Sequence, residues 1–172
     1  MGRFTRLVAA TAATVMFTTT AATLGFGAGS AAADGTNTAK GSSFVPLSST
    51  LRRCDWSDAP YVPSQNHGTG YAVLTRTGNT VTAEVHMIGV IPDIWYGVRL
   101  VQVPRPGIGC AAGDPGVGFG QLYTDGAGIG TATVQATVMN GATGAWVSVE
   151  GPVGDIHQLT GDFRTSDFIA AI

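Results

Sequence analysis

The chain contains few charged residues and no region in which basic residues gather. Charged side chains make up 12% of the 172 residues, and Arg52-Arg53 is the single adjacent basic pair. Without the two arginines of the first six residues, the 9 basic side chains fall to 7 against 11 acidic ones, a formal charge of −4. Binding to nucleic acid or to an anionic membrane surface relies on a basic patch. The composition therefore argues against both kinds of partner.

Histidines and catalytic motifs are also scarce. His67, His86 and His157 are the only histidines, and they are far apart in the sequence, so a metal site would have to be assembled by tertiary folding. His86 alternates with apolar residues and is expected to be an exposed strand residue. No G-x-S-x-G motif is present, so a serine hydrolase has no support from motifs. We predict no cofactor.

The first 33 residues have the composition of a secretory signal peptide. Two arginines stand in the first six residues, residues 7–33 carry no charge, and the run ends in Ala31-Ala32-Ala33. A basic start, an uncharged middle and a small-residue cleavage site are typical of such peptides. A retained membrane anchor is the alternative, because the run is long enough to span a bilayer. Its many threonines favour cleavage. We predict a mature chain of residues 34–172 without a membrane span, secreted or held in the cell envelope.

Cys54 and Cys110 are the only cysteines. In an oxidising compartment two thiols most simply form a disulfide, which would close a loop of about 57 residues and stabilise the fold by about 3–4 kcal/mol in the chain-entropy model. Reactive or metal-binding thiols are the alternative. However, neither cysteine stands in a C-x-x-C motif or beside a histidine, so we predict the bridge.

Alternation with a period of two indicates strands throughout the rest of the chain. From Val81 to Met87 apolar residues alternate with polar ones, as in a half-buried antiparallel strand. Glycine and proline turn signals separate such stretches, and no helical period follows residue 33. Pro46 is expected to keep the first strand at a sheet edge. The expected strands are residues 44–51, 70–77, 80–88, 95–103, 119–124, 130–138, 145–150 and 162–172.

These strands predict an all-β fold, an antiparallel Greek-key β-sandwich or flattened barrel of about seven or eight strands. Residues 34–43 are small and polar and are expected to form a flexible leader. Residues 44–172 are expected to form a single domain, because a mature chain of this length can enclose a core of its own. We expect a monomer.

A longer pattern resembles a known family. The segment V-x-A-x-V-x-x-x-G-x-x-P-x-x-x-Y-G-V-x-L-V, followed by G-C, resembles the central hairpin and disulfide loop of copper–zinc superoxide dismutases and of chordin-type domains. The later L-Y-T-D-G-A-G-x-G and A-W-V-S-V-E-G-P segments fit the second half of that Greek-key barrel. The chain is also similar to small exported actinobacterial proteins of unknown function through CDWSDAP, GVRLVQVPRP and FRTSDF. These resemblances imply a secreted β-domain and no activity.

The dismutase metal ligands have no counterparts here. Where that family carries H-x-H, this chain has Arg99 and Val101, and the later family histidine falls at Val149 or Ser148. Copper and zinc in such a site need several converging imidazoles. The resemblance therefore implies the scaffold without the metal chemistry.

Arg99 is the most informative single position. It lies between Val98 and Leu100, so its side chain must reach solvent or pair with a carboxylate. A half-buried, paired arginine would make Arg99→Ala destabilising by about 1–3 kcal/mol. The candidate partners are Asp114, Asp155 and Asp162. Alternatively, the guanidinium could anchor a ligand beside Trp95, Tyr96 or Trp56.

Two classes of function remain. The first is a non-catalytic secreted or cell-envelope domain that binds a protein, glycan or envelope component through its loops. The alternative is an enzyme, for example a hydrolase, whose site forms only in three dimensions. An exposed aromatic patch would favour the first class, and a cleft with converging polar groups would favour the second. We predict the first class and therefore no enzyme.

Overall fold

The computed structural model describes residues 41–59, 67–153 and 161–172. The predicted signal peptide and most of the predicted leader lie outside these residues. The described part of the chain contains nine strands and no helix, hence no helix that could cross a membrane. The strands are β1 (Ser43–Ser48), β2 (Thr69–Thr77), β3 (Thr80–Ile88), β4 (Trp95–Val103), β5 (Val117–Tyr123), β6 (Gly130–Thr137), β7 (Gly144–Val153), β8 (Gly161–Ser166) and β9 (Ala170–Ala171).

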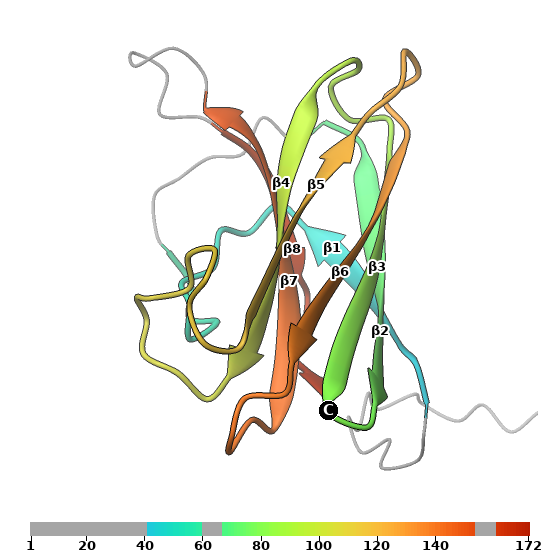
Figure 1. Ribbon diagram of the computed structural model, residues 1–172. Coiled ribbons are helices and arrows are strands. Elements are labelled where there is room, and N and C mark those ends of the chain that lie inside the picture. The colour runs from blue at the N-terminus through green and yellow to red at the C-terminus, as the bar shows by residue number, and fades with distance from the viewer. Residues whose placement is uncertain (1–40, 60–66, 154–160) are drawn as a thin grey trace, which may run out of the picture. The chain divides into compact units, whose positions relative to one another are not determined.

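All nine strands belong to one sheet (Figure 1). The hydrogen-bonded order is β5-β4-β7-β8-β1-β2-β3-β6, with β9 paired to β7, and all of these strand pairs are antiparallel. β3 pairs with β6 and β4 pairs with β7, so β3 and β4 are not neighbours in the sheet although they follow one another in the sequence. The connection between them therefore crosses from one part of the sheet to another. This connection makes a Greek key. The predicted fold class, a Greek-key sandwich or flattened barrel, is confirmed.

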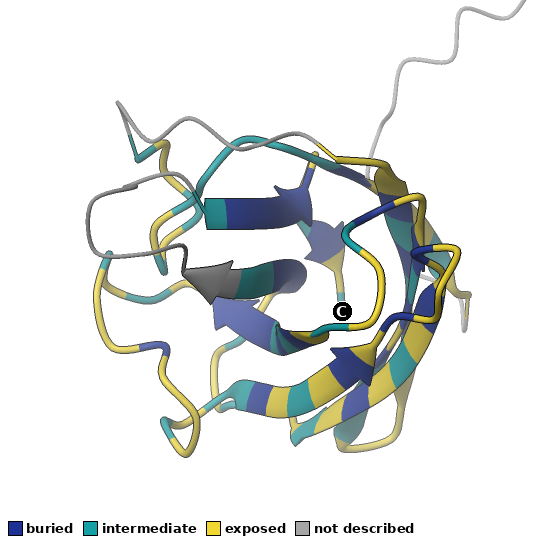
Figure 2. Ribbon diagram, turned by 90° about the horizontal axis from the view of Figure 1, so that it is seen from above, coloured by how far each residue is buried: buried dark blue, intermediate teal, exposed yellow. Residues whose placement is uncertain are grey.

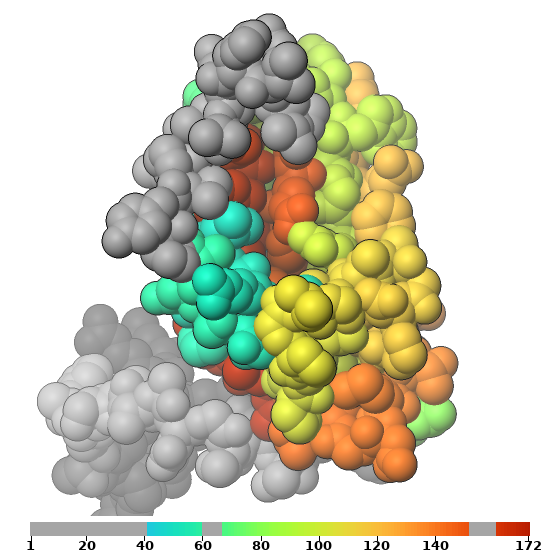
Figure 3. All heavy atoms as spheres, turned by 90° about the vertical axis from the view of Figure 1, so that its left-hand side faces the viewer, coloured from blue at the N-terminus to red at the C-terminus, as the bar shows by residue number. Residues whose placement is uncertain are grey.

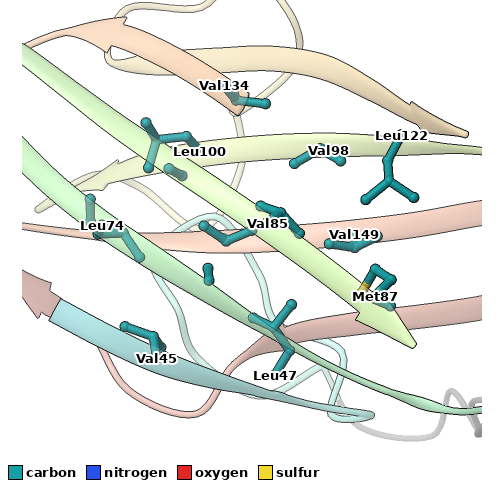
Figure 4. Packing of buried hydrophobic residues seen from close by; sticks show 14 of the residues in the cluster. Val45, Leu47, Leu74, Val85, Met87, Val98, Leu100, Leu122, Val134 and Val149 are labelled. Atoms are coloured by element: carbon teal, nitrogen blue, oxygen red, sulfur yellow. The ribbon is translucent and has the colours of Figure 1, made fainter. Parts of the chain in front are cut away.

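The core lies inside the nearly closed sheet and follows the predicted alternation. Side chains from all of the strands β1 to β7 meet there (Figure 4), among them Val45, Val85, Val98, Leu122 and Val149. On β3 and its neighbours buried and exposed residues alternate, and Figure 2 shows this as stripes. In β8, however, every residue from Asp162 to Ser166 is buried. The outer face of β8 must therefore be covered by other parts of the chain, because its inner face already lies against the core.

The sheet is closed between β5 and β6 by glycine contacts. These two strands stand at opposite ends of the hydrogen-bonded order. A Cβ at Gly118 would lie 2.6 Å from the carbonyl oxygen of Gln135, and one at Gly120 would lie 2.8 Å from Val134. Only glycine leaves room for the Gln135 backbone and the Val134 side chain to approach β5 so closely. At one end of β6, a hydrogen bond also connects this strand to β4: Gln102 Nε2 donates to Thr137 O at 2.8 Å.

Two details of the predicted strands are wrong. β1 is not an edge strand, because it pairs with both β2 and β8. Pro46 is tolerated because only Leu47 and Ser48 pair with β8, and the carbonyl of Pro46 accepts the amide of Asp167, just beyond the end of β8. The expected last strand over residues 162–172 is also broken, since β8 ends at Ser166 and β9 comprises only Ala170–Ala171.

A polar cluster of Tyr96, Asp162 and Arg164 lies within the sheet. The Tyr96 hydroxyl donates to Asp162 Oδ2 at 2.6 Å, and Arg164 Nη1 lies 3.2 Å from Asp162 Oδ1. Only 2% of the Asp162 side chain and 3% of the Arg164 side chain are exposed. Arg164 also donates to the backbone carbonyls of His67 and Gly68. Burial and the hydrogen bond to Asp162 raise the pKa of Tyr96 well above its usual value.

Candidate functional site

The outward-pointing residues of β4, β5 and β7 form a continuous surface. The strand register places Trp95 opposite Tyr123, and Arg99 opposite both Phe119 and Ser148. Gly97 pairs with Gln121 on one side and Glu150 on the other. Because alternate residues share one face of a sheet, these side chains point the same way. We call this surface the aromatic face; it comprises Trp95, Gly97, Arg99, Phe119, Gln121, Tyr123 and Glu150.

Three aromatic rings of this face are open to solvent. The exposed fractions are 59% for Trp95, 51% for Phe119 and 46% for Tyr123. Trp95 and Tyr123 are in contact, with ring centroids 5.1 Å apart and planes tilted by 53°. Gly97 carries no side chain, and a Cβ there would lie 3.7 Å from Phe119 Cε2. The centre of the aromatic face therefore consists of the Gly97 backbone, with the Phe119 ring against it, and the side chain of Gln121 on the neighbouring strand.

A charged pair borders the rings. Arg99 Nη2 donates to Glu150 Oε1, and Ser148 Oγ donates to the same oxygen at 2.7 Å. Arg99 Nη1 lies 3.4 Å from the carbonyl oxygen of Cys110. The Arg99 side chain is 26% exposed and that of Glu150 38%. The predicted pairing of Arg99 with a carboxylate is thus present, but the partner comes from a neighbouring strand and not from the loops.

The loop aspartates suggested as partners of Arg99 have other contacts. Asp114 Oδ2 accepts the amide of Ala111 at 2.7 Å, and Asp162 belongs to the buried cluster with Tyr96. Asp155 lies outside the described residues. Glu150 was missed because it lies within a predicted strand, and its proximity to Arg99 depends on the pairing of β4 with β7.

Asp93 stands at the other end of the aromatic face. Its backbone is left-handed, with φ of 57°, and its amide bonds to the carbonyl of Thr124 at 3.1 Å. The Tyr123 hydroxyl lies 3.4 Å from Asp93 Oδ1. Aspartate is among the few non-glycine residues that adopt this conformation readily. The turn thus places a second carboxylate at the edge of the exposed rings.

The predicted disulfide between Cys54 and Cys110 is present. The disulfide joins residues 51–59 to the loop after β4, and the two segments lie over the outer side of β4 and β7. There the disulfide packs in a small apolar cluster with Trp56, Val101, Val103 and Trp146. Figure 3 shows these two segments meeting, teal and yellow, with β7 and β8 visible in a hollow above them. This packing explains why β4 and β7 are buried on both faces near the disulfide: the core covers their inner face, and the two joined segments cover their outer face.

The positions at which the sequence resemblance would place dismutase ligands hold no metal-binding set. Arg99 is paired with Glu150, Val101 is fully buried beneath the disulfide-linked loops, and Ser148 bonds to Glu150. Among residues 41–59, 67–153 and 161–172, no group of three or more His, Cys, Asp or Glu could hold a metal ion. His86 points outward as predicted, stacked on Tyr71, and His157 lies outside the described residues.

A second group of aromatic residues lies on β1, β2 and β3. Phe44 stacks on Tyr71 with ring centroids 4.9 Å apart, and Tyr71 stacks on His86 at 4.6 Å. The planes are within 29° and 15° of parallel, so these rings cover one another's faces. Phe44 is 59% exposed, the same fraction as Trp95, so it provides a comparison for the aromatic face.

Comparison with known protein families, with characterised proteins and with solved structures found no match to this chain.

Replacing Arg99 by alanine should lower the free energy of unfolding by about 1 kcal/mol. Its pair with Glu150 is partly exposed, so solvent screening reduces its strength to that of a surface pair, and the remaining loss comes from packing of the side-chain stem. Urea denaturation of Arg99→Ala, Glu150→Gln and the double variant measures the coupling, expected to be about 0.5–1 kcal/mol. Additive losses would show that the pair does not stabilise the fold.

Proposed function

We propose that this protein is a non-catalytic, exported binding domain that acts outside the cell or in the cell envelope. The observation that carries the proposal is the aromatic face. Exposed aromatic residues gathered on one surface mark interaction sites, and tryptophan, tyrosine and arginine dominate the energy of many interfaces. The binding surface is then a sheet face, whereas the sequence alone suggested the loops.

Export is part of the proposal and rests on two features. The chain begins with a segment of signal-peptide composition, and its two cysteines form a disulfide, which persists mainly in oxidising compartments. The Greek-key sheet is compatible with a scaffold of the copper–zinc dismutase type whose ligand positions have become a paired arginine and a buried valine. Such a scaffold would serve binding in place of metal chemistry.

The expected result is that the purified protein, immobilised, retains a component of envelope extract and that Trp95→Ala weakens this retention at least tenfold. A tryptophan that becomes buried when the partner binds commonly contributes about 2 kcal/mol or more to binding. Phe44→Ala is the matched control, because Phe44 is also 59% exposed but lies on β1. Retention that is unaffected by Trp95→Ala, or lost equally in Phe44→Ala, would contradict the proposed role of the aromatic face.

A further inference from the structure

The aromatic face presents exposed rings at two places along β5, one at Phe119 and the other at Tyr123. Phe119 and Tyr123 lie four residues apart on β5, which corresponds to about 13 Å along the strand. Trp95 stands beside Tyr123, and between Phe119 and Tyr123 lies Gln121, opposite Gly97. Partners that are folded proteins usually bury anchoring side chains in pockets. Exposed rings along a sheet suit instead a ligand made of successive flat, apolar ring faces.

The charges of this surface favour an uncharged ligand. On the outward positions of β4, β5 and β7, within the described residues, Arg99 is the only cation, and it is neutralised by Glu150. Its second terminal nitrogen is directed to the carbonyl of Cys110. Asp93 adds a carboxylate beside Tyr123. A phosphate, sulfate or uronate group would find acidic groups and no free cation here, so charge complementarity disfavours an anionic polymer.

The polar groups around the rings suit hydroxyl groups. Glu150 and Asp93 supply carboxylate acceptors, and Gln121 supplies an amide that both donates and accepts. A pyranose ring presents C–H groups on its face, which pack on an aromatic ring, and hydroxyl groups on its edge, which donate and accept hydrogen bonds. The combination of exposed rings, planar polar side chains and compensated charge therefore matches a sugar chain.

From these three features we infer that the aromatic face binds a neutral polysaccharide, with sugar rings stacked on Trp95, Tyr123 and Phe119. The edge hydroxyls donate to Glu150 and Asp93. This inference rests on the proposed binding function and names the chemical class of its ligand. No covalent step is involved, and binding should be reversible.

Titration with neutral oligosaccharides tests the inference. The probes are β-glucan, mannan, xylan and N-acetylglucosamine hexasaccharides, with polygalacturonate and a sulfated glycan as anionic counterparts. At least one neutral probe should bind saturably and change the fluorescence of the exposed Trp95. Its affinity should vary less than twofold between about 0.05 and 0.5 M NaCl, because no charge pairing is involved. Binding of the anionic probes alone, or of no probe, would overturn the inference.

Variants connect the binding to the aromatic face. Tyr123→Ala and Phe119→Ala should each weaken the affinity for the neutral probe by about tenfold, within the range of aromatic interface residues. Affinity should be unchanged in Phe44→Ala, where the lost ring belongs to the stacked group on β1 to β3. Since both sets of residues are exposed, folding is preserved, and near-ultraviolet circular dichroism checks this. Equal affinities in all variants would place the sugar elsewhere and overturn the inference.

Treated envelope extracts separate this inference from the proposed function. A mixture of glucanase, mannanase, xylanase and chitinase degrades the neutral polysaccharides, whereas protease removes proteins. Retention by the immobilised protein should be lost after treatment with the glycoside hydrolases and survive protease treatment. If it is lost with protease and survives the glycoside hydrolases, the ligand is a protein; the glycan inference then fails while the proposed binding function stands. If untreated extract contains nothing that is retained, the proposed function itself fails.

Discussion

Asp162→Asn should lower the free energy of unfolding by about 3–5 kcal/mol, the loss expected when one member of a buried ion pair is removed. Asp162 and Arg164 lie within the sheet with their side chains almost fully buried. The variant removes the carboxylate that faces the Arg164 guanidinium at 3.2 Å and weakens the acceptor of the Tyr96 hydroxyl. Such a loss is a large part of the stability of a domain of this size.

Urea denaturation measures this loss, and two further variants identify its origin. Tyr96→Phe removes a hydroxyl but no charge, so it should cost only about 1–3 kcal/mol. Asp162→Leu combined with Arg164→Met replaces both charges by apolar groups and should cost less than the sum of the two single replacements. If Asp162→Asn is no more destabilising than Tyr96→Phe, the buried charge is not the dominant effect, and the prediction is wrong.

Removal of the disulfide by Cys54→Ala with Cys110→Ala should lower stability by about 3–4 kcal/mol. The bridge spans a sequence separation of 56, so it restricts the unfolded chain strongly. It also holds two loops over Trp146, which is buried on the outer side of β7. None of the residues of the main core belongs to this outer cluster. The sheet should therefore persist while the loops loosen.

Two measurements distinguish this local effect from general unfolding. Far-ultraviolet circular dichroism should stay unchanged at low temperature, because the strands are retained. Acrylamide quenching should increase as Trp146 becomes accessible, and reduction of the unmodified protein should produce the same increase. A variant whose quenching and thermal midpoint equal those of the unmodified protein would show that neither the bridge nor its cover stabilises the fold.

The exposed aromatic residues show where prediction from the sequence reached its limit. The strand 95–103 was predicted with its observed bounds, and residues 119–124 were predicted close to β5. Alternation therefore already placed Trp95 and Arg99 on one side of their strand. That Tyr123 and Phe119 lie beside them depends on the pairing of β4 with β5. Register between strands is decided by contacts distant in sequence, so local patterns could not supply it.

Local rules determined those features that depend on neighbouring residues. The period of two specified β3 with its inward face, the glycine turn signal between the expected strands 70–77 and 80–88 specified the hairpin of β2 and β3, and a count of two cysteines specified the disulfide. Each follows from steric preference, burial of one strand face or simple pairing. These are properties that a short segment carries by itself.

Only the tertiary structure decided which polar groups meet. Glu150 is the partner of Arg99 because β7 pairs with β4, and Asp162 points inward to Tyr96 and Arg164, although it was a candidate partner of Arg99. Pro46 lies in a strand that has neighbours on both sides, and it is tolerated there because only Leu47 and Ser48 of this strand pair with β8. Charges and hydrogen-bonding groups find their partners across strands that the chain reaches by long connections. Their positions therefore depend on the whole sheet and not on any one segment.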